Sequence, residues 1–296
     1  MKILAGPNSE KIAQKIAEQL NLNQLGLSYK LFSDGESYLQ IEGNPDKEDI
    51  IIVQTTFPNQ EKSLLELLLL SKTLKELGAD KIIAIIPYLC YARADRKRVD
   101  GEVVSHSITM DLLSTAGIDS LVTVNVHNSE VFHNTAKDLE KYNLSILPAI
   151  IDYFKDKITE DWVIVGPDKG SKEDIALFAK ELSLPSFVLE KYRDPIDHDV
   201  RFKDTEYECQ SKSIILLDDV ITSGGTALKA IKLLLEKNPS NIQFVVVHAL
   251  AENKVFNEMR EMGVKDIISV NTIPRDDIEQ IDISLLISKF IEEKFL

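Results

Sequence analysis

The feature that most constrains this chain is the stretch of residues 213–226, which reads SIILLDDVITSGGT. Its apolar start has the length and branching of a buried parallel strand. Two carboxylates, Asp218 and Asp219, follow directly. Small residues at 222–226 then precede an apolar-periodic segment, residues 227–235, which predicts a helix. The stretch therefore predicts a strand, a loop and a helix in succession, the repeating unit of parallel α/β sheets.

The loop at residues 222–226 is predicted to bind an anion. Small residues let backbone N–H groups approach a ligand closely, and the positive end of the following helix dipole favours a phosphate. Asp218 and Asp219 would repel a phosphate, and they suit sugar hydroxyls or a cation better. One loop could therefore hold both ends of a phosphorylated sugar. The alternative is an ordinary strand-to-helix turn with solvated acids, because a glycine pair alone is a weak signal.

Length and charge narrow the class of protein. The 296 residues are enough for about two domains. The 34 basic and 48 acidic residues give a formal net charge of -14, which argues against nucleic-acid and membrane partners, since their phosphates are held by clustered lysines and arginines. Cys90 and Cys209 form no CxxC pattern, so neither a disulfide framework nor a zinc site is expected. The sequence has no signal-peptide core or long apolar run, and we expect a soluble, cytoplasmic protein.

Segments of helical and extended periodicity fill the rest of the chain. The predicted strands cover residues 3–5, 49–55, 80–87, 120–126, 162–165, 186–189, 242–250 and 266–270. The predicted helices cover residues 12–20, 62–77, 105–115, 148–157, 253–262 and 284–294, the first capped by Asn8 or Ser9 and the second well buried because its leucines exceed one face. Residues 29–41 predict a β-hairpin that turns at Asp34 and Gly35, and residues 191–195 predict an irregular loop. The polar stretch 134–143 divides the chain into domains 1–143 and 144–296.

Charged side chains follow four of the predicted strands. They are the basic run that contains Arg93, Arg96 and Arg98, then His127, Asp168 and the pair Asp218 and Asp219. Ligands of open parallel sheets bind beyond the carboxyl ends of the strands, so these groups are expected to gather at one edge of the molecule. Each has an ordinary alternative: the arginines could form a solvated face, and the histidine could be a hydrogen-bonded residue at a strand end.

Several separate motifs, in this order, give the chain a resemblance to the ribose-phosphate pyrophosphokinase (phosphoribosyl pyrophosphate synthetase) family over almost its whole length. FSDGE at 32–36 is similar to the family's adenine-nucleotide hairpin, and residues 87–96 are similar to its PYxxYARxDR segment. Residues 124–127 resemble the strand that ends in a metal-linked histidine. PDKG at 167–170 resembles the pyrophosphate loop, KYR at 191–193 the catalytic loop, and residues 213–226 the ribose-phosphate loop of type I phosphoribosyltransferase folds.

The resemblance implies a fold and an activity. The fold would be α/β, with two tandem type I phosphoribosyltransferase-like domains, each a mostly parallel sheet flanked by helices. The activity would be that of a ribose-phosphate diphosphokinase, which uses Mg²⁺ and transfers the β,γ-diphosphoryl group of ATP to the 1-hydroxyl of ribose 5-phosphate. The products would be 5-phosphoribosyl 1-pyrophosphate and AMP. The resemblance also implies a homo-oligomer built from dimers, with a hexamer as one possible size, in which residues 32–36 complete the neighbouring subunit's ATP site.

The site residues implied by the resemblance fall into four groups. The catalytic residues are Lys191 and Arg193. The ATP-binding residues are Phe32, Asp34, Gly35, Glu36, Arg93, Ala94 and Arg96. The ribose 5-phosphate-binding residues are Arg193, Asp218, Asp219, Thr222, Ser223, Gly224, Gly225 and Thr226. The metal-binding residues are His127 and Asp168.

The chain departs from the common family pattern at four positions. Ala94 stands where a glutamine is usual, Asn125 replaces a frequent aspartate, and Thr222 and Ser223 vary the phosphate loop. These changes remove no cation or acid that the chemistry requires, but they leave nucleotide and metal preference open.

Two rival functions stay open. A phosphoribosyltransferase that consumes phosphoribosyl pyrophosphate would share the acidic loop, but it would not need the hairpin and arginines of the first half. The other rival function is that of a non-catalytic regulatory homologue. The chain retains Lys191, Arg193, His127 and Asp168, which weighs against it.

Overall fold

A computed structural model describes residues 1–193, 200–203 and 208–296. Its contacts divide the chain into two compact units. The first comprises Met1–Ser145, Thr272–Pro274 and Ile283–Leu296, and the second comprises Ile146–Asn271 and Arg275–Asp282. The sequence assigned residues 284–294 to the second domain, but their helix packs on the first helix of the chain and so joins the first unit. Across the described ranges, no helix is both long and apolar enough to cross a membrane.

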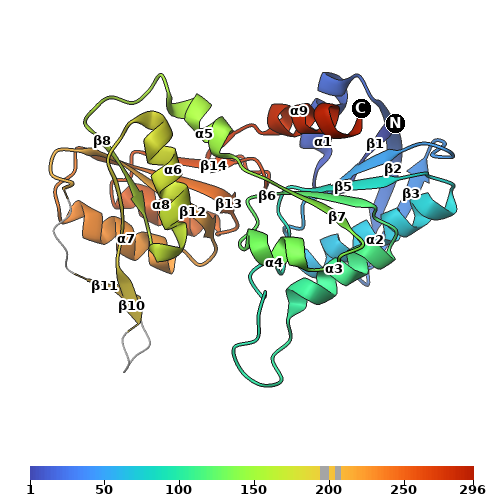
Figure 1. The fold of residues 1–296 in the computed structure, drawn as a ribbon, viewed down its shortest axis with the longest axis horizontal. Coiled ribbons are helices and arrows are strands. Elements are labelled where there is room, and N and C mark those ends of the chain that lie inside the picture. The colour runs from blue at the N-terminus through green and yellow to red at the C-terminus, as the bar shows by residue number, and fades with distance from the viewer. Residues whose placement is uncertain (194–199, 204–207) are drawn as a thin grey trace. The chain divides into compact units, whose positions relative to one another are not determined.

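The first unit is built on a seven-stranded sheet with the order β3-β2-β1-β4-β5-β6-β7 (Figure 1). Its strands are β1 (Lys2–Ala5), β2 (Asn23–Leu31), β3 (Ser37–Glu42), β4 (Ile50–Val53), β5 (Ile82–Ile86), β6 (Ser120–Val124) and β7 (Glu140–Leu144). Only the β2–β3 pair is antiparallel. The helices are α1 (Glu10–Leu20), α2 (Gln60–Glu76), α3 (Ser105–Thr115), α4 (Ser129–Asn134) and α9 (Ser284–Phe295).

The first unit follows the rules of parallel sheets. Every residue of β4 and β5 is buried, as expected for central strands covered on both faces. The chain crosses from β4 to β5 and then to β6 in one direction, so right-handed connections put α2 and α3 on the same face. Buried residues of both helices pack in one core with these strands. The helix α1 packs instead against α9.

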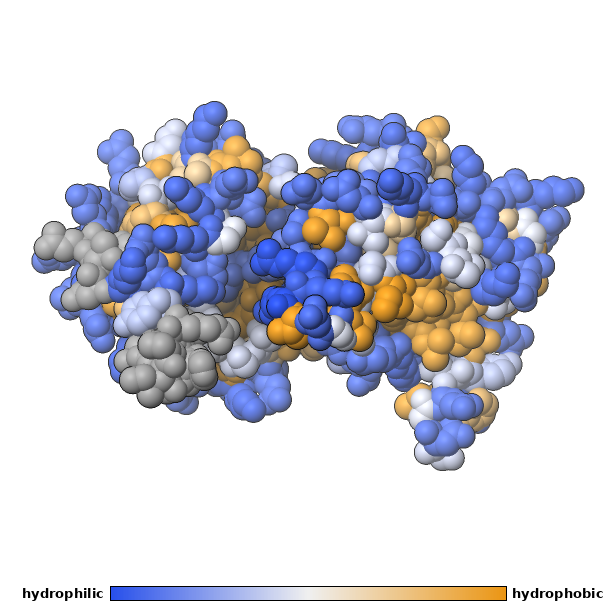
Figure 2. All heavy atoms as spheres, turned by 60° about the horizontal axis from the view of Figure 1, so that its bottom comes forward, coloured by the Kyte–Doolittle hydropathy of each residue, from blue (hydrophilic) through white to orange (hydrophobic). Residues whose placement is uncertain are grey.

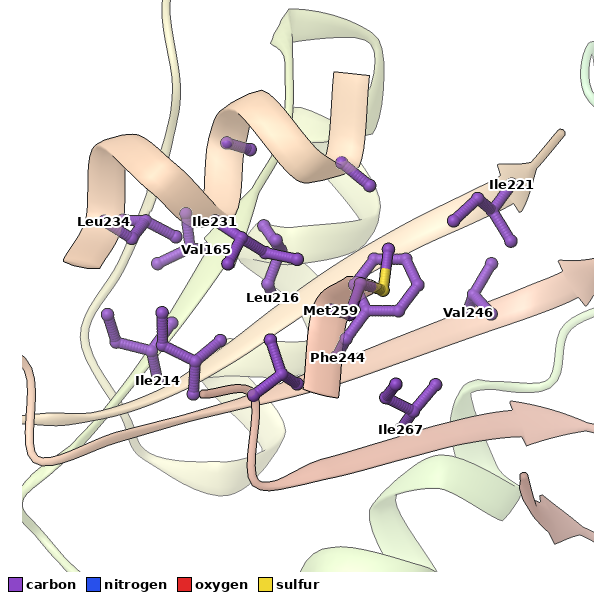
Figure 3. Close-up of a cluster of buried hydrophobic side chains, with 14 of the residues drawn as sticks. Val165, Ile214, Leu216, Ile221, Ile231, Leu234, Phe244, Val246, Met259 and Ile267 are labelled. Atoms are coloured by element: carbon purple, nitrogen blue, oxygen red, sulfur yellow. The ribbon is translucent and has the colours of Figure 1, made fainter. Parts of the chain in front are cut away.

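The second unit is built on a parallel six-stranded sheet with the order β15-β14-β13-β12-β8-β9. Its strands are β8 (Trp162–Gly166), β9 (Ser186–Val188), β12 (Ser213–Ile221), β13 (Asn241–Ala249), β14 (Asp266–Val270) and β15 (Glu279–Ile281). The helices are α5 (Leu147–Phe154), α6 (Lys172–Leu182), α7 (Gly225–Leu235) and α8 (Asn253–Glu261), with a short 3₁₀ turn at Lys169–Ser171. Figure 3 shows Leu216, Phe244 and Met259 meeting in the core beneath α7 and α8.

The two mostly parallel sheets with flanking helices confirm the predicted α/β class, but several local predictions were wrong. The strand β12 continues through Asp218 and Asp219 instead of ending before them, because β13 pairs with it as far as Ile221. Residues 191–193 are not irregular. They form β10 (Lys191–Arg193), which pairs antiparallel with β11 (Val200–Phe202). The remainder of the predicted loop, residues 194 and 195, lies outside the described residues.

Two predictions about helices also need correction. The helix α1 has Ser9 at its N-cap, but the Ser9 side chain does not cap it, since its Oγ accepts a hydrogen bond from the Thr55 backbone N–H at 2.8 Å. The helix α2 is not buried all round. Leu65 and Leu69 are 56% and 47% exposed, so part of its outer face is apolar and open. The polar stretch 134–143 is also more than a linker, because β7 lies partly within it.

Candidate functional site

The carboxyl end of β12 carries the acidic pair. The neighbouring strand β8 pairs with β12 only as far as Leu216, whereas β13 continues alongside Asp218 and beyond. On the β8 side, Asp218 and Asp219 therefore extend past the end of the neighbouring strand. Asp168 follows the end of β8 by two residues, so these three carboxylates collect at one edge of the second unit's sheet.

The electrostatics of this edge favour a neutral or cation-bound Asp218. Burial, reinforced by the neighbouring Asp219 carboxylate and then by Asp168, raises the pKa of Asp218 well above its ordinary value. Burial and then Asp219 also raise the pKa of Asp174 on α6. The sequence did not single out Asp174, because nothing in its local pattern shows that α6 brings it near Asp219. A site with this excess of carboxylate suits hydroxyl donors or a cation.

The predicted phosphate loop joins β12 directly to α7. Gly224 is the N-cap residue of α7 and has φ 79°, a conformation that favours glycine. A Cβ at Gly224 would also lie 2.3 Å from Cγ1 of Val255. The loop is thus confined between the strand end and α8, and it leads into the first turn of a helix, a position that suits phosphate.

Asp168 and Lys191 are in contact. The Asp168 Oδ2 atom forms an ion pair with Lys191 Nζ, and Oδ1 accepts a hydrogen bond from Gly170 N–H at 2.7 Å. Both side chains are part-exposed. The second catalytic candidate, Arg193, lies in the same strand β10. The structure therefore brings the predicted pyrophosphate loop and catalytic segment together within the second unit.

In the first unit, the basic segment follows β5 as a tight turn. Tyr88 O accepts hydrogen bonds from Thr56 Oγ1 at 2.6 Å and Thr56 N at 3.0 Å. The same Oγ1 accepts from Cys90 N at 2.7 Å. Arg93 and Arg96 are exposed, while the N–H of Ala94 is used by the turn itself. The segment after β5 is therefore fixed by Thr56 and presents its arginines to solvent.

His127 lies in the segment that follows β6, the neighbour of β5. The next residue, Asn128, caps α4 by accepting from Val131 N at 3.1 Å and donates its amide to Asp95 Oδ2 at 2.8 Å. Asn125 has φ 42°, in the left-handed region that asparagine tolerates better than most residues. The contact between Asp95 and Asn128 ties the basic segment to the histidine segment. These two predicted sites therefore lie together.

The hairpin extends beyond the sheet. The strand β1 pairs with β2 only up to Leu25, so β2 and β3 continue as a two-stranded arm. The tip holds Asp34 and Glu36, both exposed, with Asp34 Oδ1 accepting from Glu36 N at 3.1 Å and Gly35 at φ 95°. Since β1 and β4 separate β2 from β5, the arm's base is three strand spacings from β5, or roughly 14 Å. The sheet order therefore does not bring hairpin and basic segment side by side.

The helix α2 holds the arm. Glu66, only 2% exposed, accepts from Ser37 Oγ at 2.6 Å. Lys62 Nζ lies 3.7 Å from Glu66 Oε1 and donates to Tyr29 Oη at 2.7 Å. These anchors were not predicted from the sequence, although an acid that interrupts a leucine run is a visible signal for a buried polar contact.

An apolar surface covers the outer faces of α2 and α3. Figure 2 shows hydrophobic side chains gathered on the face of the first unit that carries these helices. The exposed residues are Leu65 and Leu69 on α2 and Ile108 and Leu112 on α3. We call these four residues the α2–α3 patch. A cavity of about 270 Å³ opens beside Leu69, between α2 and the hairpin. Patches of this kind on soluble proteins usually mark interaction sites.

Within the described residues, no three His, Cys, Asp or Glu side chains are clustered to hold a metal ion. The two predicted metal residues lie in different units: His127 in the first and Asp168 in the second. Asp168 offers carboxylate oxygens, the donors that Mg²⁺ prefers. The donor type at Asp168 therefore fits magnesium.

Known proteins match both halves of the chain. The N-terminal domain of ribose phosphate pyrophosphokinase matches residues 1–117, and the phosphoribosyl transferase domain matches residues 141–279. A ribose-phosphate pyrophosphokinase of Saccharolobus solfataricus is 33% identical over 96% of this chain and 97% of its own length. One of Methanobrevibacter smithii is 34% identical over 93% of this chain and 94% of its own. The crystal structure of phosphoribosylpyrophosphate synthetase from Mycobacterium smegmatis matches with a TM-score of 0.87 and 25% identity, covering 99% of this chain and 98% of that chain.

Proposed function

Because this chain belongs to the ribose-phosphate pyrophosphokinase family, we propose that it transfers the β,γ-diphosphoryl group of ATP to the 1-hydroxyl of ribose 5-phosphate. The products are 5-phosphoribosyl 1-pyrophosphate and AMP. The observation that carries the proposal is the edge of the second unit, where Asp168, Lys191, the acidic pair and the loop 222–226 lie together. A phosphate loop, sugar-binding acids and a cation are the groups that this transfer needs.

Ribose 5-phosphate is assigned to the end of β12. The backbone N–H groups of residues 222–226 and the start of α7 bind the 5-phosphate. Asp218 and Asp219 accept hydrogen bonds from the ribose hydroxyls, since carboxylates are strong acceptors. Thr222, Ser223 and Thr226 add hydroxyl donors. The substrate is thereby held at both ends, which fixes the 1-hydroxyl for attack.

ATP is assigned to the basic segment and to a hairpin. Arg93 and Arg96 bind its phosphates, and Ala94 leaves one polar contact fewer than the family's usual glutamine. Phe32 lies alongside adenine, with Asp34 and Glu36 as hydrogen-bond acceptors on the exposed tip. These roles rest on the family resemblance and are supported by the exposure of the side chains.

Charge stabilisation is the main chemical task of the site. Charge builds up on the oxygens of the diphosphoryl group during transfer, so fixed cations and positioning supply most of the catalysis. Lys191 and Arg193 are proposed to provide these cations. Lys191 pairs with Asp168, so this carboxylate holds its ammonium group next to the pyrophosphate loop. Both residues lie in a short strand at the end of β9, outside the sheet core.

Magnesium is the proposed cofactor, with Asp168 and His127 as the residues that hold it. When bound, Mg²⁺ would neutralise part of the phosphate charge and orient the ATP phosphates. Asp168 would supply a carboxylate oxygen directly, and His127 would act directly or through water. Asn125, which replaces a frequent aspartate, leaves the segment next to His127 with one negative charge fewer.

A homo-oligomer is proposed in which residues 32–36 of one subunit complete its neighbour's ATP site. Two features support this arrangement: the hairpin arm extends beyond its own sheet, and the α2–α3 patch leaves apolar side chains exposed beside it. A dimer is the basic unit, and a hexamer is one size it can build. Cys90 and Cys209 are both buried and free, as in reducing compartments, which supports a cytoplasmic location.

The decisive test is an assay of purified protein with Mg²⁺, ATP and ribose 5-phosphate. We expect AMP and 5-phosphoribosyl 1-pyrophosphate in equal amounts, with no added base and no other subunit. Product formation only after addition of a second homologue would instead support the regulatory alternative. Consumption of 5-phosphoribosyl 1-pyrophosphate with a nucleobase, without AMP formation from ATP, would identify a phosphoribosyltransferase.

A further inference from the structure

Tyr91 has a backbone conformation that its side chain does not favour. Its φ is 61°, in the left-handed region, where a bulky aromatic residue is rare. Residues in such conformations persist only when the surrounding structure holds them, and they cluster at functional sites. Tyr91 lies two residues before Arg93, within the segment assigned to the ATP phosphates.

Two contacts hold this conformation. The Tyr91 hydroxyl donates to Glu61 Oε1 at 2.7 Å, and its ring packs against the core of the first unit. Glu61 belongs to the first turn of α2. The hydrogen bond to Glu61, more than burial, raises the pKa of Tyr91 to about 12, so the phenol stays a donor at physiological pH. A bond from a hydroxyl to a carboxylate is stronger than one between neutral groups.

The geometry of the turn connects this contact to Arg93. Ala94 N–H donates to Tyr91 O at 3.0 Å, which closes a β-turn over residues 91–94 with Ala92 and Arg93 at its centre. Ala92 is buried and Arg93 is exposed. Rotation of the chain at Tyr91 would therefore turn the whole β-turn and redirect the guanidinium group.

We propose that Tyr91 and Glu61 are positioning residues that aim Arg93 at the phosphates of ATP. The proposal rests on the assigned role of Arg93 in the function given above. Tyr91 does not touch the nucleotide in this scheme, and it acts through the β-turn. The bond from Tyr91 to α2 sets the turn in advance, so that ATP binding does not have to order it.

The test measures binding of MgATP to the full-length protein by calorimetry, with no ribose 5-phosphate present. Tyr91→Phe keeps the ring and removes the donor, and Glu61→Ala removes the acceptor. We expect each to weaken MgATP about tenfold, the usual effect of losing one hydrogen bond to a charged group. Ribose 5-phosphate affinity should not change. Glu61→Gln keeps an acceptor oxygen and should retain most of the affinity.

The matched control is Tyr142→Phe, which removes a tyrosine hydroxyl that donates to Glu140 at the edge strand β7. It should leave MgATP affinity unchanged. Unfolding temperatures of the variants separate positioning from loss of fold: an affinity loss at full stability supports positioning. If Tyr91→Phe does not fold, Glu61→Ala on the exposed side of α2 tests the same contact.

A double-mutant cycle with Arg93→Ala separates this inference from the proposed function. If Tyr91 acts through Arg93, Tyr91→Phe adds no further loss in the Arg93→Ala background. Equal MgATP affinity of Arg93→Ala and the unmodified protein would overturn the phosphate-binding assignment itself. A large effect of Arg93→Ala with none from Tyr91→Phe or Glu61→Ala, or fully additive losses, would overturn only the positioning role.

Discussion

Asp218, which we assign to the ribose hydroxyls, shows how a residue proposed for binding can lower the stability of its own fold. Its raised pKa means that the folded protein holds the proton more tightly than the unfolded chain. The stability that the protonated Asp218 contributes is therefore fully present below the unfolded pKa, near 3.8. It is lost as pH rises through the folded pKa. Between these two pKa values the folded protein loses about 1.4 kcal/mol of stability per pH unit through this one group.

We therefore predict that Asp218→Asn raises the free energy of unfolding at pH 7, with less gain near pH 4, while it weakens ribose 5-phosphate more than ATP. The amide is neutral at both pH values and reproduces only part of the hydroxyl contacts. Denaturant unfolding at the two pH values and separate ligand titrations measure the effects. Equal losses for both ligands would mean that Asp218 governs the metal or the fold instead.

Asp277 provides the opposite case for comparison. Arg275 donates hydrogen bonds to the Asp277 carboxylate and so lowers the pKa of Asp277. The stability that Asp277 contributes to the fold is therefore present above the unfolded pKa and is lost as pH falls through the folded pKa. Asp277→Asn should therefore destabilise at pH 7, and the loss should shrink in acid. A gain in stability from both variants at pH 7 would rule out this account of Asp218.

Lys191 and Arg193 are expected to serve the transition state more than substrate binding. Lys191→Ala and Arg193→Ala should each lower kcat about a hundredfold or more, with MgATP affinity nearly unchanged. Lys155→Ala is a suitable control, since Lys155 is an exposed cation next to α5 that forms an ion pair with Asp152 and lies outside the proposed site. Near-normal kcat in both catalytic variants would contradict the assignment.

At the scale of residues, periodicity predicted strands just before the basic segment, His127 and Asp168, and β5, β6 and β8 end there. The hydrogen bonds that hold the neighbouring segments in place were not predictable. The bonds from Tyr91 to Glu61 and from Ser37 to Glu66 join residues about thirty positions apart. Only the packing of α2 against the strands brings them together.

At the scale of elements, the hairpin arm depends on α2 for its orientation. We predict that Ser37→Ala speeds amide exchange in β2 and β3 while β4 and β5 keep their protection, since it removes a contact of the arm to a buried carboxylate. MgATP affinity in the assembled protein should fall as well. Gln40→Ala is the control, because the side chain of Gln40 accepts its hydrogen bond from Tyr38 within the arm, and the variant should leave exchange unchanged. Unaltered exchange in Ser37→Ala would show that the arm is held by other contacts.

Local pattern predicted most helices and strands but not their partners. The alternation in residues 29–41 was enough for a hairpin, because its pairing is local. The strand β10 needed pairing with β11, which the charged sequence of residues 191–193 does not suggest. The leucines of α2 predicted burial, and the open α2–α3 patch shows that apolar composition does not say which surface covers a helix.

At the scale of the whole molecule, the α2–α3 patch leads to a prediction about assembly. Leu65→Glu with Leu69→Glu should lower the oligomeric mass measured by light scattering, because charges placed in an apolar interface oppose association. Leu177→Glu is the matched control, since Leu177 is 47% exposed on α6, outside the patch. Unchanged mass in the double variant would mean that the patch is not the interface.

An ATP site shared between two subunits leads to a second prediction at this scale. Asp34→Ala/Glu36→Ala protein and Lys191→Ala protein should each be inactive. When their subunits are allowed to exchange, some sites receive an intact hairpin from one chain and an intact Lys191 from the other, and activity should return. Verified exchange without recovery would show that each chain builds its nucleotide site alone.

The contribution of α9 to the first unit has a consequence for synthesis on the ribosome. Its residues Ile287 and Ile291 are buried there, and Gln19 of α1 bonds to Ser284 and Ser288 at 3.2 and 2.7 Å. Domains generally fold in the order in which they emerge. Here α9 is translated only after the whole second unit, so the half of the protein that is made first is the last to be finished. Until then the side of α1 that packs on α9 stays uncovered on the nascent chain.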